Sequence, residues 1–151
     1  MNIVAQCCGL VIMSIIIAFY RCQKKLGLNT SKTFFAIWTV TVTSLLLDIG
    51  SVLSLTYREY MPEFVLDLIC KAYLVSIVFE ALTGLGYICI DVLKKNGTWV
   101  RWERHIFYVL LLDIIIVSSL EIYKSDKPYT YTYGPAVIAT YIIGFFIVSC
   151  I

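Results

Sequence analysis

Hydrophobic residues gather into five long runs along the chain, separated by shorter stretches that carry most of the charged residues. The runs extend from about residue 3 to 20, 33 to 57, 65 to 90, 106 to 122 and 135 to 151. A run of about 18 or more apolar residues can cross about 30 Å of hydrocarbon as a helix. Backbone amides in lipid must bond within their own segment, which favours helices. The pattern therefore predicts an all-α fold, a single polytopic transmembrane helix bundle of five spans.

Lysine and arginine residues are concentrated in two of the four connections between these runs. They are Arg21, Lys24, Lys25 and Lys32 after the first run, and Lys94, Lys95, Arg101 and Arg104 after the third. Loops rich in these residues stay in the cytoplasm, so we expect the N-terminus outside and the C-terminus inside. The fifth run stops at Ile151 without a polar flank, which predicts that the chain is truncated at its C-terminus.

The composition agrees with a membrane protein and narrows its chemistry. Hydrophobic residues make up 60% of the chain and charged residues 15%, against about 45–50% apolar residues in ordinary soluble domains. The net charge of +2 is too small to indicate a nucleic-acid partner. The six cysteines lack metal-ligand spacing, and the single histidine, His105, has no partner in a catalytic motif. We expect no metal, no cofactor and no enzymatic activity.

Three acidic residues lie deep within the apolar runs: Asp48, Glu80 and Asp113. An ionised acid at the centre of a membrane helix costs about 2.5–3.5 kcal/mol, so these residues must be paired, protonated or hydrated. Asp48 belongs to a polar stripe with steps of three and four residues, which places its members on one helix face and predicts that this face contacts protein. The stripe consists of Thr41, Ser44, Asp48, Ser51 and Ser54.

Counting residues along each run suggests partners for the buried charges. Asp48 and Lys71 fall at similar depths, which predicts an ion pair between the second and third runs. Glu80 and Asp113 both fall nearer the cytoplasmic side, and if they are neighbours at least one of them should hold a proton at neutral pH. We expect Asp113 to face the bundle, neutral or sharing a proton with Glu80. Together with Ser44 and Ser51, these four residues are the candidates for sensing within the membrane.

The same residues admit three roles. They can act as hydrogen-bonding contacts between helices, each contributing about 0.6 kcal/mol on average. They can form a site that senses a ligand or a proton, or they can line a transport path.

Several short segments of the chain resemble a known class of sensor. With "AQCCGLVIM", "FYRCQKKLGLNTSKTFF", "LLLDIGSV", "ICKAYLVS" and "YTYGPAV", the chain is similar to the N-terminal multi-helix membrane region of GGDEF-domain signalling proteins of clostridial-type bacteria. In that family a cytoplasmic diguanylate cyclase domain follows and makes cyclic di-GMP from GTP with a divalent metal. This sequence contains no Gly-Gly-(Asp/Glu)-Glu-Phe motif, so no catalytic residue is carried over.

The resemblance implies an input or anchoring module of a signal-transduction protein in the bacterial inner membrane. The missing output domain would be cytoplasmic, on the side where we expect the C-terminus. The expected partners are the lipid bilayer, a small ligand or a proton, and, as a further possibility, a second copy of the chain. The alternative function is a fragment of a proton-coupled transporter or channel that uses the acids as a relay.

Overall fold

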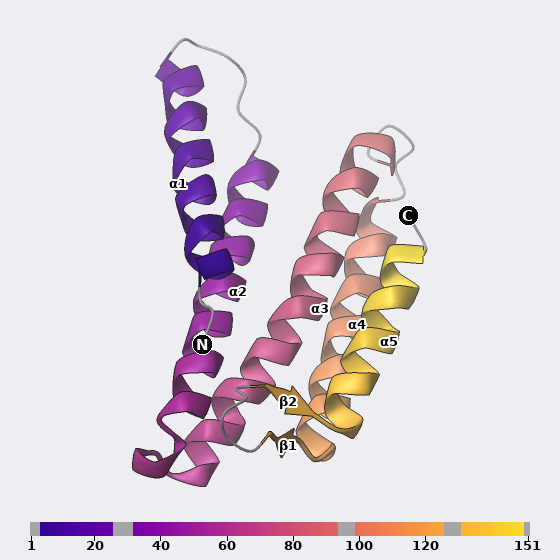
Figure 1. The fold of residues 1–151 in the computed structure, drawn as a ribbon. Helices are drawn as coiled ribbons and strands as arrows, with labels where there is room; N and C mark the ends of the chain where they lie inside the picture. Colours follow the sequence, from indigo (N-terminus) through magenta and orange to yellow (C-terminus); the bar gives the residue numbers. More distant parts are fainter. Residues whose placement is uncertain (1–3, 26–31, 94–98, 126–130, 150–151) are drawn as a thin grey trace.

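The computed structural model describes residues 4–25, 32–93, 99–125 and 131–149, and these residues are almost entirely helical. Its elements are α1 (Val4–Lys25), α2 (Lys32–Thr56), the short 3-10 helix η1 (Arg58–Tyr60), α3 (Glu63–Leu93), α4 (Trp99–Ser119), β1 (Tyr123–Lys124), β2 (Thr132–Tyr133) and α5 (Pro135–Ser149). Successive helices run in opposite directions (Figure 1). The all-α expectation is confirmed, with one small β-hairpin in addition.

The helix ends differ from the ends of the apolar runs at several points. α1 continues through the basic residues to Lys25, and α4 begins at Trp99 rather than near residue 106. Polar residues continue a helix at little cost when they have good helix propensity, so the end of an apolar run need not end the helix. α4 stops at Ser119, before Ile122, because Ile122 packs against a cluster formed by Leu55, Leu66 and Cys70.

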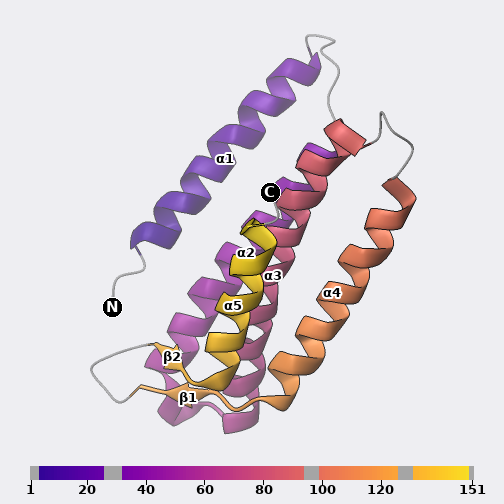
Figure 2. The same cartoon turned by 90° about the vertical axis from the view of Figure 1, so that its right-hand side faces the viewer.

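α3 is the central helix of the molecule. It contacts α2 on one side and α4 and α5 on the other, whereas α1 contacts α2. In Figure 1, α1 and α2 form one arm and α3, α4 and α5 form the other, whereas the view of Figure 2 shows α1 and α4 on opposite sides of the remaining helices. The arms meet at the end of the molecule where β1 and β2 lie, which we call the hairpin end. They diverge toward the opposite end.

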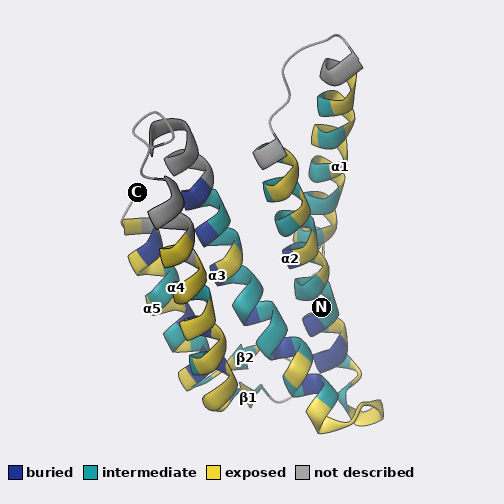
Figure 3. Cartoon of the chain, turned by 180° about the vertical axis from the view of Figure 1, so that it is seen from behind, coloured by how far each residue is buried: buried dark blue, intermediate teal, exposed yellow. Residues whose placement is uncertain are grey.

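The core follows one stripe of α3. Leu66 and Cys70 pack near the hairpin end, Leu74 packs with Val117 and Ala136, and Val78, Leu82 and Leu85 pack with Ile147. These α3 residues recur at steps of three or four, the spacing that keeps side chains on one face of a helix. Figure 3 shows this buried stripe as dark blue segments along α3.

Large apolar side chains outside this core are widely exposed. On α1, Val11, Ile12, Ile15 and Phe19 are all more than half exposed, with Phe19 at 69%. Two helices of the described part contain segments long and apolar enough to cross a membrane, Val4–Cys22 in α1 and Phe34–Thr56 in α2. α4 and α5 contain shorter apolar segments. An exposed apolar surface of this extent is typical of contact with a membrane or another protein.

The β-hairpin fastens the two arms at the hairpin end. Lys124 forms an ion pair with Asp67 of α3 at 2.5 Å, and Arg58 of η1 donates a hydrogen bond to the Ser125 carbonyl at 3.1 Å. We call the hairpin and these two contacts the hairpin clamp. Gly134, which follows β2, has a φ of +119°, a conformation that glycine adopts readily. A Cβ atom there would lie 2.8 Å from the Cδ2 atom of Tyr123.

Candidate functional site

The polar stripe of α2 faces protein, as the sequence predicts. Ser44, Ser51 and Ser54 are all buried, with exposed fractions of 6% or less. The Ser44 hydroxyl lies 3.3 Å from the hydroxyl of Ser76 on α3, and this contact ties the two helices together. The stripe and the facing side of α3 form what we call the α2–α3 seam.

Asp48 lies in this seam and is held by two donors. The Nε2 atom of Gln6 on α1 donates a hydrogen bond of 2.9 Å to its Oδ2 atom. The Tyr73 side chain of α3 donates a further hydrogen bond to Asp48. Donors from two other helices favour a carboxylate that acts as acceptor. The Asp48 side chain therefore joins α1, α2 and α3 at one point.

The expected ion pair between Asp48 and Lys71 is wrong. The Nζ atom of Lys71 donates a hydrogen bond of 2.8 Å to the backbone carbonyl of Ser118 on α4. Lys71 and Tyr73 are two positions apart on α3, which turns their side chains toward different sides of the helix. Tyr73 thus reaches α2 while Lys71 reaches α4, and similar depth did not bring Lys71 to Asp48.

Glu80 continues the α2–α3 seam toward the open end of the two arms. It lies one turn beyond Ser76 on α3, and it interacts electrostatically with Tyr73. The residues on either side of it, Val78 and Leu82, belong to the opposite face, which packs against Leu110 of α4. Glu80 therefore belongs to the side of α3 that faces α2.

Asp113 lies on the other side of α3. Its side chain is completely buried in the group of α3, α4 and α5, so the expectation that it faces the bundle is confirmed. Neither of its carboxyl oxygens has a hydrogen-bond partner among the residues that the structure describes. The expected sharing of a proton with Glu80 is therefore wrong, because α3 itself separates the two side chains. Counting residues gave the two acids a similar depth, but it did not give the rotation of each helix, which turns their side chains apart.

The residues one turn from Asp113 on α4 are apolar. Leu110 and Val117, one turn away on either side of it, pack into the buried clusters on α3. Thr140 of α5 is also completely buried, and its hydroxyl donates to the Ala136 carbonyl of its own helix. A buried polar group without a partner costs about 1–3 kcal/mol. Such a residue is a candidate for function because packing alone would favour a hydrophobic side chain.

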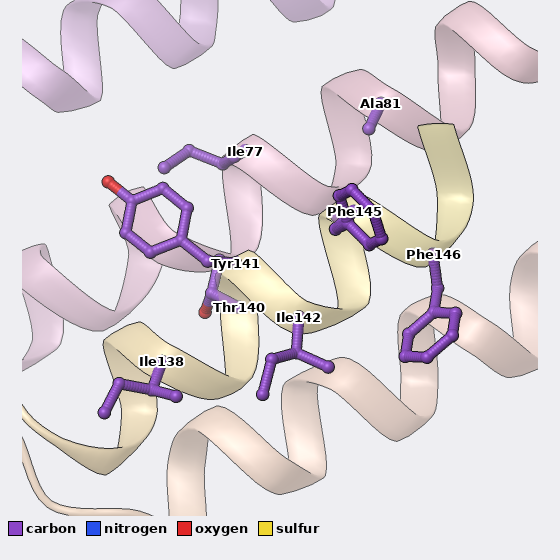
Figure 4. Close-up of a pocket in the computed structure, with 9 residues that line it drawn as sticks. Ile77, Ala81, Ile138, Thr140, Tyr141, Ile142, Phe145 and Phe146 are labelled. Carbon is purple, nitrogen blue, oxygen red and sulfur yellow. The ribbon is translucent and has the colours of Figure 1, made fainter. Parts of the chain in front are cut away.

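α3 and α5 line an open groove that the sequence did not predict. It has a volume of about 850 Å³, within the range of about 300–1,000 Å³ typical of small-molecule sites. Ile77 and Ala81 line it from α3. In Figure 4 the Tyr141 and Phe145 side chains project from one side of α5, and Ile142 and Phe146 from the opposite side. The lining is almost wholly apolar, so the groove suits the apolar part of a ligand.

Gln6 and Tyr73 are the site residues that sequence reasoning missed. Gln6 is a strongly polar side chain among apolar residues near the start of the first run, and that isolation was the available signal. Tyr73 lies within the third apolar run and belongs to no polar stripe that would have marked it. In the described ranges, histidine, cysteine and acidic side chains form no group of three or more that could hold a metal ion.

The chain was compared with known proteins in three ways. No family model matches it, and neither the curated proteins nor the solved structures contain a match.

Proposed function

We propose that the chain is the input module of a bacterial signal-transduction protein, a multi-pass bundle in the inner membrane. A ligand or a proton bound within the bundle would alter how its helices pack. The observation that carries this proposal is Asp113, a completely buried carboxyl group with no hydrogen-bond partner in the described part of the chain. Ionisable residues within apolar helices are costly and usually functional.

The membrane placement rests on the exposed apolar surface. α1 and α2 each contain a segment long enough to cross a bilayer, and the α1 segment is not buried within the protein at all. Five spans with the N-terminus outside would put the hairpin clamp outside the cell and both strongly basic loops in the cytoplasm. This topology belongs to the proposal, as does the output that it serves, which the family resemblance suggests is cyclic di-GMP synthesis by a cytoplasmic domain.

The position of the acids favours a switch over a transport relay. A relay needs neighbouring proton carriers, but Asp48 and Glu80 belong to the α2–α3 seam while Asp113 lies on the side of α4 and α5. A switch needs only that a ligand or proton bind one packing of the helices more tightly than another. Asp113 meets this need because its charge state changes the cost of burying it among α3, α4 and α5.

The proposal is tested in bacterial cells that express the chain followed by the proposed cytoplasmic diguanylate cyclase domain. Cyclic di-GMP is measured while the pH is varied, in the natural protein and in its Asp113→Asn and Asp113→Leu variants. A matched control is Ser118→Ala, since Ser118 lies on the same helix and is exposed. We expect both Asp113 variants to lose the pH response and the control to keep it. An unchanged response in both Asp113 variants would rule out proton sensing through this residue.

Topology is tested separately. A periplasm-dependent reporter fused after Ser125 should be active, and the same reporter fused after Lys95 should be inactive. The reverse pattern would invert the proposed orientation, and activity at both positions would contradict the span between them.

A further inference from the structure

The groove between α3 and α5 is bordered by the α2–α3 seam. Ile77 lines the groove, and it lies one turn from both Tyr73 and Glu80 on α3. Tyr141 lines the groove from α5 and interacts electrostatically with Tyr73. Tyr73 therefore stands between the apolar groove and the carboxyl groups of Asp48 and Glu80, with both of which it also interacts.

Within the described ranges, neither Asp48 nor Glu80 forms an ion pair with a basic residue. Lys71, the basic residue nearest to Tyr73 on α3, donates its hydrogen bond to Ser118 on α4. At the hairpin end, Lys124 pairs with Asp67. Among the residues that the structure describes, the hydrogen-bond partners of Asp48 are neutral, namely Gln6 and Tyr73. The carboxyl group of Asp48 is thus held by neutral hydrogen-bond donors rather than by positive charge.

From this arrangement we infer that the groove binds an amphiphilic organic cation. Its apolar body lies against Ile77, Ala81 and Phe145, and its cationic head lies toward Asp48 and Glu80 beside the tyrosine rings. Charge complementarity selects this occupant over a neutral or anionic one, because a cation is the species that the border attracts. The inference deepens the proposed function, on which it rests, by naming the chemical class of the input.

The two tyrosines suit the head of such a ligand. The face of a tyrosine ring attracts a cation within about 6 Å, and the attraction grows when water is excluded. Tyr141 comes from α5 and Tyr73 from α3, while Asp48 comes from α2. A bound cation would therefore contact both arms of the molecule, and its binding would favour the packing in which the arms lie closest.

Direct binding to the purified full chain tests the inference. Radiolabelled tetraphenylphosphonium is the probe, in a non-ionic detergent, and tetraphenylborate is its competitor of similar shape and opposite charge. We expect tetraphenylphosphonium to bind and unlabelled tetraphenylborate not to displace it. The Asp48→Asn and Glu80→Gln variants should each weaken binding about tenfold, a loss of about 1.4 kcal/mol.

Matched variants distinguish the effect of charge on binding affinity from the effect of shape. Glu63→Gln removes an exposed carboxyl group in the first turn of α3 and should change affinity less than about twofold, which is under about 0.4 kcal/mol. Tyr141→Phe keeps the ring and should bind better than Tyr141→Ala. Phe145→Ala enlarges the groove without touching its charged border and should weaken binding of the apolar body. All variants are first matched for helix content and elution volume.

Three results would overturn the inference. They are displacement by tetraphenylborate, full affinity in the Asp48→Asn and Glu80→Gln double variant, and an equal loss in Glu63→Gln. The first would mean that the groove takes apolar molecules of any charge, including lipid tails. This experiment measures binding and no signalling output. A negative result would therefore reject the cation site without rejecting the proposed function, which is tested separately through Asp113.

Discussion

Lys71 donates a hydrogen bond from its Nζ atom to the backbone carbonyl of Ser118, 2.8 Å away on the neighbouring helix. Ser118 lies in the last turn of α4, where carbonyl groups lack partners within their own helix and carry the negative end of the helix dipole. A cation placed there stabilises the helix by about 0.3–1 kcal/mol at exposed positions. Lys71 is therefore a cap for α4 contributed by α3.

This geometry predicts that Lys71 and Asp48 act independently. In a double-mutant cycle of Lys71→Met and Asp48→Asn, the two changes in unfolding free energy should add to within about 0.5 kcal/mol. Unfolding would be followed by circular dichroism in mixed micelles with increasing denaturing detergent. The positive control is a cycle of Gln6→Ala with Asp48→Asn, which should show coupling of about 0.6–1.7 kcal/mol. Strong coupling between Lys71 and Asp48 would restore the ion pair that depth alone suggested.

Replacement of Asp113 by leucine should stabilise the fold. The buried carboxyl group has no hydrogen-bond partner in the described residues, and an apolar side chain of similar size removes a desolvation cost of about 1–3 kcal/mol. The measurement is the unfolding free energy in micelles. Val117→Asp is the informative reverse change, because Val117 is equally buried, and it should destabilise the fold by at least as much. A less stable Asp113→Leu protein would show that this carboxyl group has a partner that matters.

Gly134 should tolerate no side chain, whereas Gly84 should accept one. At Gly134 a methyl group would lie 2.8 Å from the Tyr123 ring, and the φ of +119° disfavours other residues. Gly134→Ala should therefore lower stability by about 1–3 kcal/mol. At Gly84, within α3, a Cβ atom meets nothing within 4 Å, so Gly84→Ala should raise stability by up to about 1 kcal/mol. Thermal unfolding of the two variants tests the contrast, and equal effects would contradict it.

Tyr123 should ionise at unusually high pH. Its hydroxyl donates a 3.0 Å hydrogen bond to Oε2 of Glu121, and this bond, with the negative charge of Glu121, raises the pKa of Tyr123 above its ordinary value. The neutral hydroxyl is the form that the folded state favours. The stabilisation is thus complete below the pKa of the unfolded chain and is lost as pH rises through the higher folded value.

The test is the tyrosinate absorbance near 295 nm. Subtracting the titration of Tyr123→Phe from that of the natural chain isolates Tyr123, and its midpoint should lie above about 10. Glu121→Gln should move that midpoint down. A midpoint that does not respond to Glu121→Gln would mean that the carboxylate does not act on Tyr123 in solution.

The helices could be predicted from the sequence because composition and run length determine them almost alone. The lateral arrangement could not, and the acids show why. Residue counting gave the depth of Glu80 and Asp113 along their helices, but not the rotation of each helix about its axis. Residues two positions apart on α3, such as 78 and 80, face different neighbouring helices. An error in the predicted rotation of a helix therefore assigns its residues to the wrong partners.

The predicted partner of Lys71 was wrong for a related reason. A long flexible side chain binds the nearest strong hydrogen-bond acceptor. The backbone carbonyl groups at the end of a helix are such acceptors, and they cannot be recognised from the residue types in the sequence. The prediction for the polar stripe from Thr41 to Ser54 was correct because five polar residues on one face outweigh the conformation of any single side chain. The groove could not be predicted from the sequence because it is formed by the angle between α3 and α5 rather than by a motif.

The hairpin clamp places a pivot at one end of the two arms of the molecule. Its two arms are fastened at one end by Lys124 with Asp67 and Arg58 with Ser125, and they separate toward the other end (Figure 1). α2 has 25 residues and is about 37 Å long, so a rotation of about 5° at the pivot displaces its far end by about 3 Å. A sub-ångström change near the pivot is thus magnified where the basic loops begin.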